Sequence, residues 1–446
     1  MQGAIHERFV RILGPLPGQR EARAFSRVAL VGAAVACAVT LYFGLRGETF
    51  MGRPMGNDFA QFYAAGKVLN QYDPARIYDV RLMARVEQES LPTLPRTQIL
   101  VYGNAPFLAQ LFRPFAKLSY QWAYCAWLAF SLMLYGGGLW LLFRNWLPDE
   151  YGRTALLLAL SAPVYTMETW IGGQISVLAF LTAVGFVRCF AAQRYFLAGL
   201  ALGLAAYKPS LLALPVAVML LTGAWRMLGG VCVSATLTLV ASLATVGAHG
   251  LDLWFKILKV YSFLATQQNS VLRRTKYVDL NSFFSVLLGG TSLARIATLV
   301  VTAAAFLVLA RAWWTSRNQP PAIRSYLWAA TLSWTLLLNV YVPIYDTIIL
   351  IPAVALVAHS VIRRDRERQA ALQAWLVVLW LLPWLTQAFA DALRLQIFTI
   401  LLAGFGYWAL TLARGKSLAA AEKENESVLA LQGSEAPVNG VYADLV

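Results

Sequence analysis

The chain has 446 residues, of which 59% are hydrophobic and only 13% are charged, and its mean hydropathy is +0.58. Charged residues make up about a quarter of an ordinary soluble domain, so this composition excludes that class and indicates a polytopic membrane protein. The formal charge of +15 comes from 37 Lys and Arg against 22 Asp and Glu. On a membrane protein this excess mainly sets topology and contact with anionic lipid. We expect no nucleic-acid partner, because the chain has no dense basic run beyond the short RRDRER stretch.

The hydrophobic runs predict an all-α fold with about twelve transmembrane helices. The first run, residues 27–45, follows a basic segment that should hold residues 1–26 in the cytoplasm, and it is too long for a signal-peptide core. The further expected spans are residues 119–143, 154–168, 172–190, 195–207, 209–223, 228–247, 291–312, 323–341, 343–361, 371–390 and 392–413. The basic connections alternate onto one side, which marks that side as cytoplasmic. The transmembrane domain is therefore expected over residues 27–413, with residues 414–446 as a disordered cytoplasmic tail.

Two regions on the outer side carry too much polar sequence to be simple turns, residues 46–118 and 248–290. Within the first, the amphipathic stretches 60–70 and 77–89 are expected to lie along the membrane surface with their aromatic and aliphatic residues towards lipid. The proline-bracketed stretch VYGNAPFLAQLFRPFAKL is too interrupted to span and predicts a re-entrant or surface helix. Any chemistry is expected in these outer regions.

Asp58, in GNDFAQFYAAGKVL, is the main catalytic candidate. A charged group close to a bilayer core is costly to hold there, so it is usually functional or paired. Asn57, Gln61 and Tyr63 belong to the same amide and aromatic cluster and are candidate substrate contacts. The alternative is that Asp58 or Asn57 simply caps the helix that follows.

Two further polar side chains stand at outer turns. Asn104, with Tyr102, is expected to face polar space at the start of the proline-bracketed stretch, or else to cap its helix. Gln174 lies in the turn YTMETWIGGQISVLAF, where Glu168 is interpreted as an interfacial helix end. We take Asn104 and Gln174 as candidate substrate contacts.

Cations and a second acid complete the candidate site. Lys208 stands between two short apolar helices, where it either binds phosphate or extends its ammonium to the interface. Arg273 and Arg274, in NSVLRRTKY, either grip a phosphate or contact lipid headgroups. Asp346, in NVYVPIYDTIILIP, has apolar sequence on both sides and therefore needs a partner or a substrate. The four cysteines have no CxxC pair and the three histidines are scattered, so no metal site is expected.

Taken together, these segments resemble glycosyltransferase family 87, membrane enzymes of the GT-C type that use polyprenyl-phosphate sugars. The resemblance covers most of residues 50–360 and rests on the order of the elements. These are GNDFAQFYAAGKVL, NQYDPARIYD, VYGNAPFLAQLFRPFAKL, GGQISVLAF, LAGLALGLAAYKPSLLALP, NSVLRR and NVYVPIYDTIILIPAVAL. Where the family often has a Tyr-Pro-Pro run, this chain has Gly103 and Asn104 after Tyr102. The acceptor-facing loops of the family differ widely, so the acceptor is not carried over.

The resemblance implies a GT-C fold and Asp58 as the catalytic base of an inverting hexosyltransferase. A glycosyl phosphate already has a good leaving group, so one carboxylate that deprotonates an acceptor hydroxyl is enough. Lys208, Arg273 and Arg274 are the candidate phosphate contacts, and Asp346 would bind sugar hydroxyls or orient a cation. A lipid-linked sugar would be a co-substrate, so no cofactor and no metal are expected.

The expected function is thus transfer of a hexose, mannose being favoured, from a polyprenyl-phosphate sugar to a lipid or glycan hydroxyl. The expected location is the inner (plasma) membrane with the active site on the outer, periplasmic face, in contact with membrane lipid. A polytopic transporter or lipid-linked sugar flippase is the alternative, since about twelve spans suit one, although no internal repeat is found. A non-catalytic assembly subunit would make Asp58 dispensable.

Overall fold

The computed structural model describes residues 18–96, 100–266, 274–364 and 366–414. This part of the chain is built of helices and loops, with two isolated β-bridges, which confirms the predicted all-α class. The elements in chain order are α2 (Gln19–Leu45), α3 (Phe59–Gln71), η1 (Pro74–Tyr78), α4 (Val80–Ser90), η2 (Pro106–Leu108), α5 (Ala109–Phe112), η3 (Phe115–Lys117), α6 (Tyr120–Phe143), α7 (Asp149–Leu160), η4 (Val164–Ile171), α8 (Ser176–Ala191), α9 (Tyr195–Gly203), η5 (Leu204–Tyr207), η6 (Pro209–Leu211), α10 (Ala213–Thr222), α11 (Trp225–Thr266), η7 (Arg274–Lys276), α12 (Leu280–Leu287), α13 (Ser292–Thr315), α14 (Pro321–Leu337), η8 (Ile344–Ile349), α15 (Leu350–Arg364), α16 (Arg366–Leu393) and a last helix over Ile397–Arg414.

Seven helices among the described residues are long and apolar enough to cross a membrane, since a bilayer core of about 30 Å needs about 20 apolar residues. They are Gln19–Leu45, Tyr120–Phe143, Trp225–Val260, Ser292–Thr315, Ile344–Ile362, Arg368–Leu393 and Ile397–Arg414. Three shorter apolar helices are Ser176–Ala191, Tyr195–Tyr207 and Pro209–Thr222. The protein is therefore a polytopic membrane protein, and the number of about twelve spans stays a prediction.

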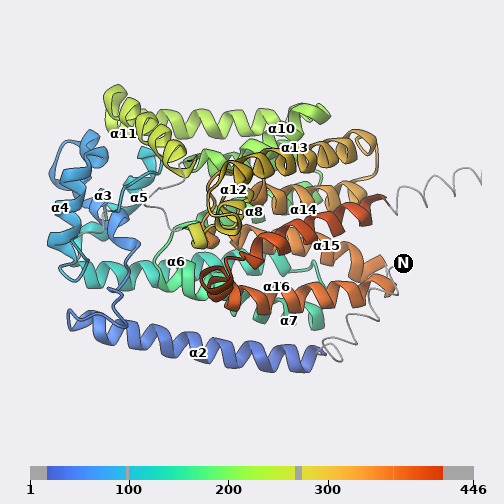
Figure 1. Cartoon of the computed structure of the whole chain (residues 1–446), viewed down its shortest axis with the longest axis horizontal. Helices are drawn as coiled ribbons and strands as arrows, with labels where there is room; N and C mark the ends of the chain where they lie inside the picture. Colours follow the sequence, from blue (N-terminus) through green and yellow to red (C-terminus); the bar gives the residue numbers. More distant parts are fainter. Residues whose placement is uncertain (1–17, 97–99, 267–273, 365, 415–446) are drawn as a thin grey trace, which may run out of the picture.

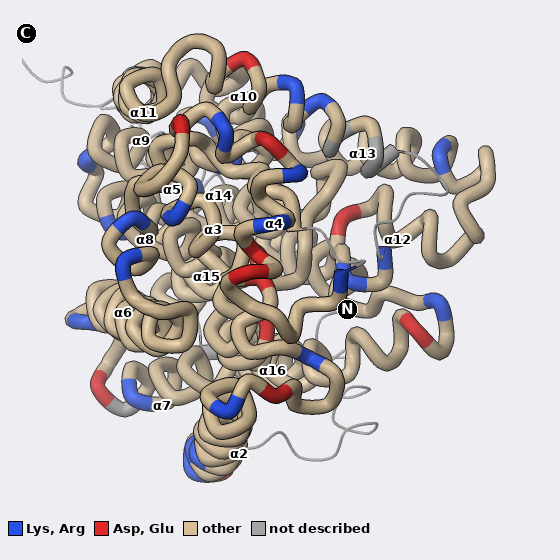
Figure 2. The backbone as a smooth tube through the Cα atoms, turned by 90° about the vertical axis from the view of Figure 1, so that its left-hand side faces the viewer, with Lys and Arg blue, Asp and Glu red and all other residues tan. Residues whose placement is uncertain are grey.

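Most of the long helices run along the length of the molecule (Figure 1). The short elements α3, α4 and α5 gather at one end, and the start of α2 lies at the other end. Figure 2 faces the end that carries α3 and α4, where acidic and basic positions both occur. The predicted first outer region thus forms one end of the bundle.

The apolar faces of α3 and α4 point into the protein, so the prediction that residues 60–70 and 77–89 turn them towards lipid is wrong. Phe59 and Phe62 of α3 are 0% and 1% exposed. The ring of Phe62 stacks on Phe112 of α5 at 5.2 Å, and Phe59 stacks on Trp127 of α6 at 6.3 Å. A hydrophobic pattern gives the direction of an apolar face but does not tell whether protein or lipid covers it.

Helix α11 continues well beyond the predicted end of its span at residue 247. Gly247 has φ 68° and ψ −179°, a combination that is open only to glycine, so the helix breaks there and then resumes to Thr266. The second half packs against the first outer region, because the Trp254 Nε1–H donates to the Gly103 carbonyl at 3.2 Å. The start of the region 248–290, predicted as a loop, is therefore helix.

Candidate active site

Asp58 stands at the N-cap position of α3, but its side chain does not cap the helix. Its backbone is already helical, with φ −77° and ψ −19°, and its carboxylate makes no cap hydrogen bond. Instead, Oδ2 accepts a hydrogen bond from Gln174 Nε2 at 2.7 Å, and Oδ1 accepts one from Asn57 Nδ2 at 3.1 Å. The capping alternative for Asp58 is therefore wrong, and its carboxylate is held by two amides.

Two tyrosines of α6 fix the backbone on both sides of this contact. The Tyr120 hydroxyl lies 3.0 Å from the Met55 carbonyl and 2.6 Å from the Gly56 carbonyl, just before Asp58. One turn later in α6, the Tyr124 hydroxyl donates to the carbonyl of Ile171, at the end of η4. A single helix therefore sets the distance between the segment of Asp58 and the segment of Gln174.

The segment that carries Gln174 begins where η4, a π-helical stretch, ends. Such stretches are rare and are often found at functional sites. Gly173 has φ +76°, and a Cβ atom there would lie 2.7 Å from Cβ of Phe59. Only glycine allows both this conformation and this close approach to the start of α3. The local sequence Gly-Gly-Gln thus allows the backbone to approach α3 closely enough for Gln174 to contact Asp58.

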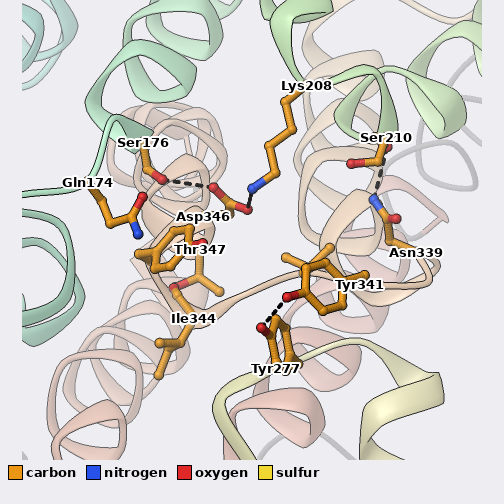
Figure 3. Close-up of polar contacts among 12 residues, drawn as sticks. Gln174, Ser176, Lys208, Ser210, Tyr277, Asn339, Tyr341, Ile344, Asp346 and Thr347 are labelled. Atoms are coloured by element: carbon orange, nitrogen blue, oxygen red, sulfur yellow. Dashed lines mark hydrogen bonds and ion pairs between the residues drawn. The ribbon is translucent and has the colours of Figure 1, made fainter. Parts of the chain in front are cut away.

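Asp346, the second candidate acid, is 1% exposed, and each of its carboxylate oxygens has a partner (Figure 3). Its Oδ1 accepts from the Ser176 hydroxyl at 2.8 Å, and its Oδ2 forms an ion pair with Lys208 Nζ. The same ammonium lies 5.4 Å from the ring centroid of Tyr345. The prediction that Asp346 needs a partner is thereby met by Lys208, whose side chain is 23% exposed.

These groups surround a recess of about 50 Å³. It is lined by Gln61, Phe62, Asn104, Gln174, Ile175, Ser176, Tyr207, Lys208, Tyr345 and Asp346. Pockets for small molecules usually measure about 300–1,000 Å³, so the recess has room for only a small polar part of a larger ligand.

The structure brings most of the predicted site residues together, but not all. Gln61, Asn104, Gln174, Lys208 and Asp346 line the recess, and Asp58 with Asn57 adjoins it through Gln174.

Two predicted site residues, Tyr63 and Arg274, are not part of the recess lining, and a third lies outside the described residues. The Tyr63 hydroxyl donates to the Leu118 carbonyl at 2.9 Å and is not part of the recess lining. Arg274 donates to the Ser285 hydroxyl at 2.6 Å. Arg273 lies outside the residues that the structure describes.

Tyr102 does not face polar space as predicted. It is 1% exposed and packs against the rings of Phe62 and Tyr78. Its hydroxyl lies 3.3 Å from the carbonyl of Ala105, while Asn104, two residues further on, borders the recess. A tyrosine ring can be buried in a core when a backbone carbonyl is within reach, because the carbonyl can accept a hydrogen bond from the hydroxyl.

Asp279 is a buried acid that sequence reasoning did not single out. Its Oδ1 caps α12 by accepting from the Ser282 backbone N–H at 2.9 Å, and its Oδ2 accepts from the Val342 N–H at 3.0 Å. Burial raises the pKa of its carboxyl to about 6. Next to it the hydroxyls of Tyr277 and Tyr341 contact each other (Figure 3). Asp279 thus ties the second outer region to the extended segment before Asp346.

Among the residues that the structure describes, no group of three or more His, Cys, Asp and Glu is placed to hold a metal ion.

Fold and site together define a polytopic membrane protein whose site combines a carboxylate held by amides with a buried acid–lysine pair. The sequence pattern of glycosyltransferase family 87 matches residues 102–339, more than half of the 446 residues. The chain belongs to glycosyltransferase family 87, which confirms the predicted family and makes the protein a membrane glycosyltransferase. No curated protein and no solved structure matches it.

The family match covers only part of the candidate site. Gln174 and Lys208 lie inside it, whereas Asp58 precedes it and Asp346 follows it. The roles of the two acids therefore depend on the geometry and not on the match. Family membership favours an enzyme over the transporter or flippase alternative.

Proposed function

We propose that this enzyme transfers a hexose from a polyprenyl-phosphate sugar to a hydroxyl group of a lipid or glycan acceptor, with mannose as the favoured sugar. Asp58 acts as the general base. The observation that carries this proposal is the placement of Asp58 at a helix start that it does not cap, held by Gln174 beside a polar recess. A carboxylate fixed in this way is available for proton transfer.

The chemistry needs few protein groups. An ionised carboxylate has about four acceptor sites, so the hydrogen bonds from Asn57 and Gln174 leave Asp58 room to accept the proton of an acceptor hydroxyl. The acceptor oxygen then attacks the anomeric carbon, the bond from that carbon to the phosphate oxygen breaks, and the phosphate leaves with the electron pair. In-line attack inverts the anomeric centre.

Lys208 is the proposed contact for the leaving phosphate. An ammonium has three donors, and the pair with Asp346 uses one of them, so others can serve a phosphate oxygen at the recess. Asp346 holds this cation in place, and Arg274 with its neighbour Arg273 is a further candidate for the phosphate. Gln61 and Asn104 at the recess are proposed to contact the sugar.

A second cavity supports a donor with an apolar chain. It measures about 410 Å³ and is lined mainly by apolar side chains from α2, α7, α15 and α16. Thr347 and Ile348, which follow Asp346 directly, belong to its lining. A prenyl tail already lies in lipid, so it gains little hydrophobic free energy on entering the cavity, but an apolar lining can accept it without cost.

Positive charge supports an orientation with the site on the outer, periplasmic face of the inner membrane. Arg20 and Arg23 stand at the start of α2, at the opposite end of the molecule from α3 (Figure 1). Because basic residues next to a span favour the cytoplasm, the end that carries Asp58 would face outward.

The donor class can be tested with the purified enzyme in proteoliposomes. Radiolabelled polyprenyl-phosphate mannose, supplied with a membrane-lipid extract as acceptor, should give a new labelled glycolipid or glycan. Nucleotide sugars should give none, because the proposed donor is recognised through its lipid chain and its single phosphate. Transfer from a nucleotide sugar, or from none of the lipid-linked hexoses, would contradict the proposal.

We also expect transfer to be independent of divalent metal, because the leaving group is a phosphate and Lys208 can serve as its cation. Activity in EDTA should equal activity in buffer. A full loss in EDTA that Mg²⁺ or Mn²⁺ restores would show this expectation to be wrong.

A further inference from the structure

We propose that Gln174 is a positioning residue for Asp58 and not a ligand of the sugar. This inference rests on the proposed role of Asp58 as the base. The Gln174 amide lies 2.7 Å from the carboxylate, and the whole residue is only 4% exposed. A hydrogen bond from a buried amide to an ionised carboxylate is charge-assisted and therefore stronger than a neutral one.

The backbone of Gln174 is fixed by contacts other than its hydrogen bond to Asp58. Its N–H donates to the Thr169 carbonyl at 2.8 Å, and the Tyr124 hydroxyl holds the carbonyl of Ile171. Gly173 packs against Phe59 at a distance that leaves no space for a Cβ atom. Because the backbone of Gln174 is held in place, its side-chain amide fixes the position of the Asp58 carboxylate.

The same short segment also orients the second acid. Ser176, two residues after Gln174, donates to Asp346 at 2.8 Å, and Asp346 in turn holds Lys208 (Figure 3). Residues 172–176 thus position both the proposed base, through Gln174, and the proposed phosphate cation, through Ser176 and Asp346. This shared support keeps the proton acceptor and the leaving-group contact in a constant relation, as an in-line displacement requires.

The first test is Gln174→Met, which keeps the length of the side chain and removes the donor. We expect kcat to fall about 10- to 100-fold, the range for a misplaced catalytic group, while KM for the lipid-linked donor stays within about twofold. Gln110→Met is the matched control, because Gln110 is exposed on α5 and hydrogen-bonds Arg113 outside the recess. It should retain both kinetic constants.

The second test is Gln174→Glu, which puts a second carboxyl group beside Asp58. Two carboxylates this close share one proton, and the shared O–H replaces the lost N–H donor. Activity of this variant relative to wild type should therefore be low at pH 8 and rise as the pH is lowered towards 6. Loss of packing would appear as a lower melting temperature of the variant at pH 8, so the melting temperature is measured at each pH, and recovery of activity at an unchanged melting temperature assigns the effect to the lost donor. Recovery within one preparation also shows that the variant is folded, should Gln174→Met prove unstable.

Specific results would overturn the assignment. A wild-type kcat in Gln174→Met would do so, and so would a raised KM with unchanged kcat, which would make Gln174 a sugar ligand. A Gln174→Glu variant that elutes as wild type but shows no pH-dependent recovery would also contradict it. The proposed function fails differently: wild-type enzyme that transfers from no lipid-linked sugar overturns both proposals, whereas active wild type with normal Gln174 variants overturns only this one.

Discussion

Asp58→Asn should lower sugar transfer by about 10²- to 10⁴-fold, the usual contribution of a general base, without loss of expression or membrane insertion. The substitution keeps the shape of the side chain, and the oxygen of the introduced amide can still accept the hydrogen bond from Gln174. What disappears is the negative group that takes the proton. Initial rates with the lipid-linked donor at saturating acceptor, measured at equal amounts of monodisperse protein, give the comparison.

Asp252→Asn is the matched control for this substitution. Asp252 is an exposed acid on α11 whose partner is Lys256, one turn away in the same helix. Exposed pairs of this kind contribute little to stability, so its loss should leave transfer and stability unchanged. If Asp58→Asn kept near wild-type transfer, the base assignment would be wrong and a non-catalytic role for this acid would gain support.

The sequence predicted the helical class and the polytopic membrane character because both follow from hydrophobic runs, which are local. It did not predict the surroundings of α3, since apolar side chains look the same whether lipid or protein covers them. Helical geometry also separates Gln61 from Tyr63: residues two apart lie about 200° apart around the axis, so one lines the recess while the other does not. Residues that are close in the sequence, such as Gln61 and Tyr63, therefore do not all belong to the same site.

The site was predicted as a set of residue types and not as a set of contacts. Asp58 and Gln174 are 116 residues apart, and Lys208 and Asp346 are 138 apart. No local pattern specifies such pairs, which depend on how α6 and α8 place their neighbours. Asp279 escaped notice for the opposite reason, because an Asp before an apolar helix has the ordinary pattern of an N-cap, and it does cap α12.

Removing either partner of the Lys208–Asp346 pair should be strongly destabilising, by about 3 to 5 kcal/mol, because an uncompensated charge remains in the protein interior. The two losses should differ. Lys208→Met leaves a carboxylate that is 1% exposed and keeps the hydrogen bond from the Ser176 hydroxyl, whereas Asp346→Asn leaves an ammonium that is 23% exposed and can reach water. Thermal unfolding in detergent should therefore show the larger decrease for Lys208→Met.

The double variant Lys208→Met/Asp346→Asn separates stability from catalysis. It has no buried charge at this position, so its melting temperature should return most of the way to wild type. Transfer should remain low, because the cation proposed for the leaving phosphate is absent. Lys256→Met, which removes a cation from an exposed pair on α11, should change neither property. A double variant that regains transfer together with stability would assign the pair to folding alone and leave the phosphate without Lys208.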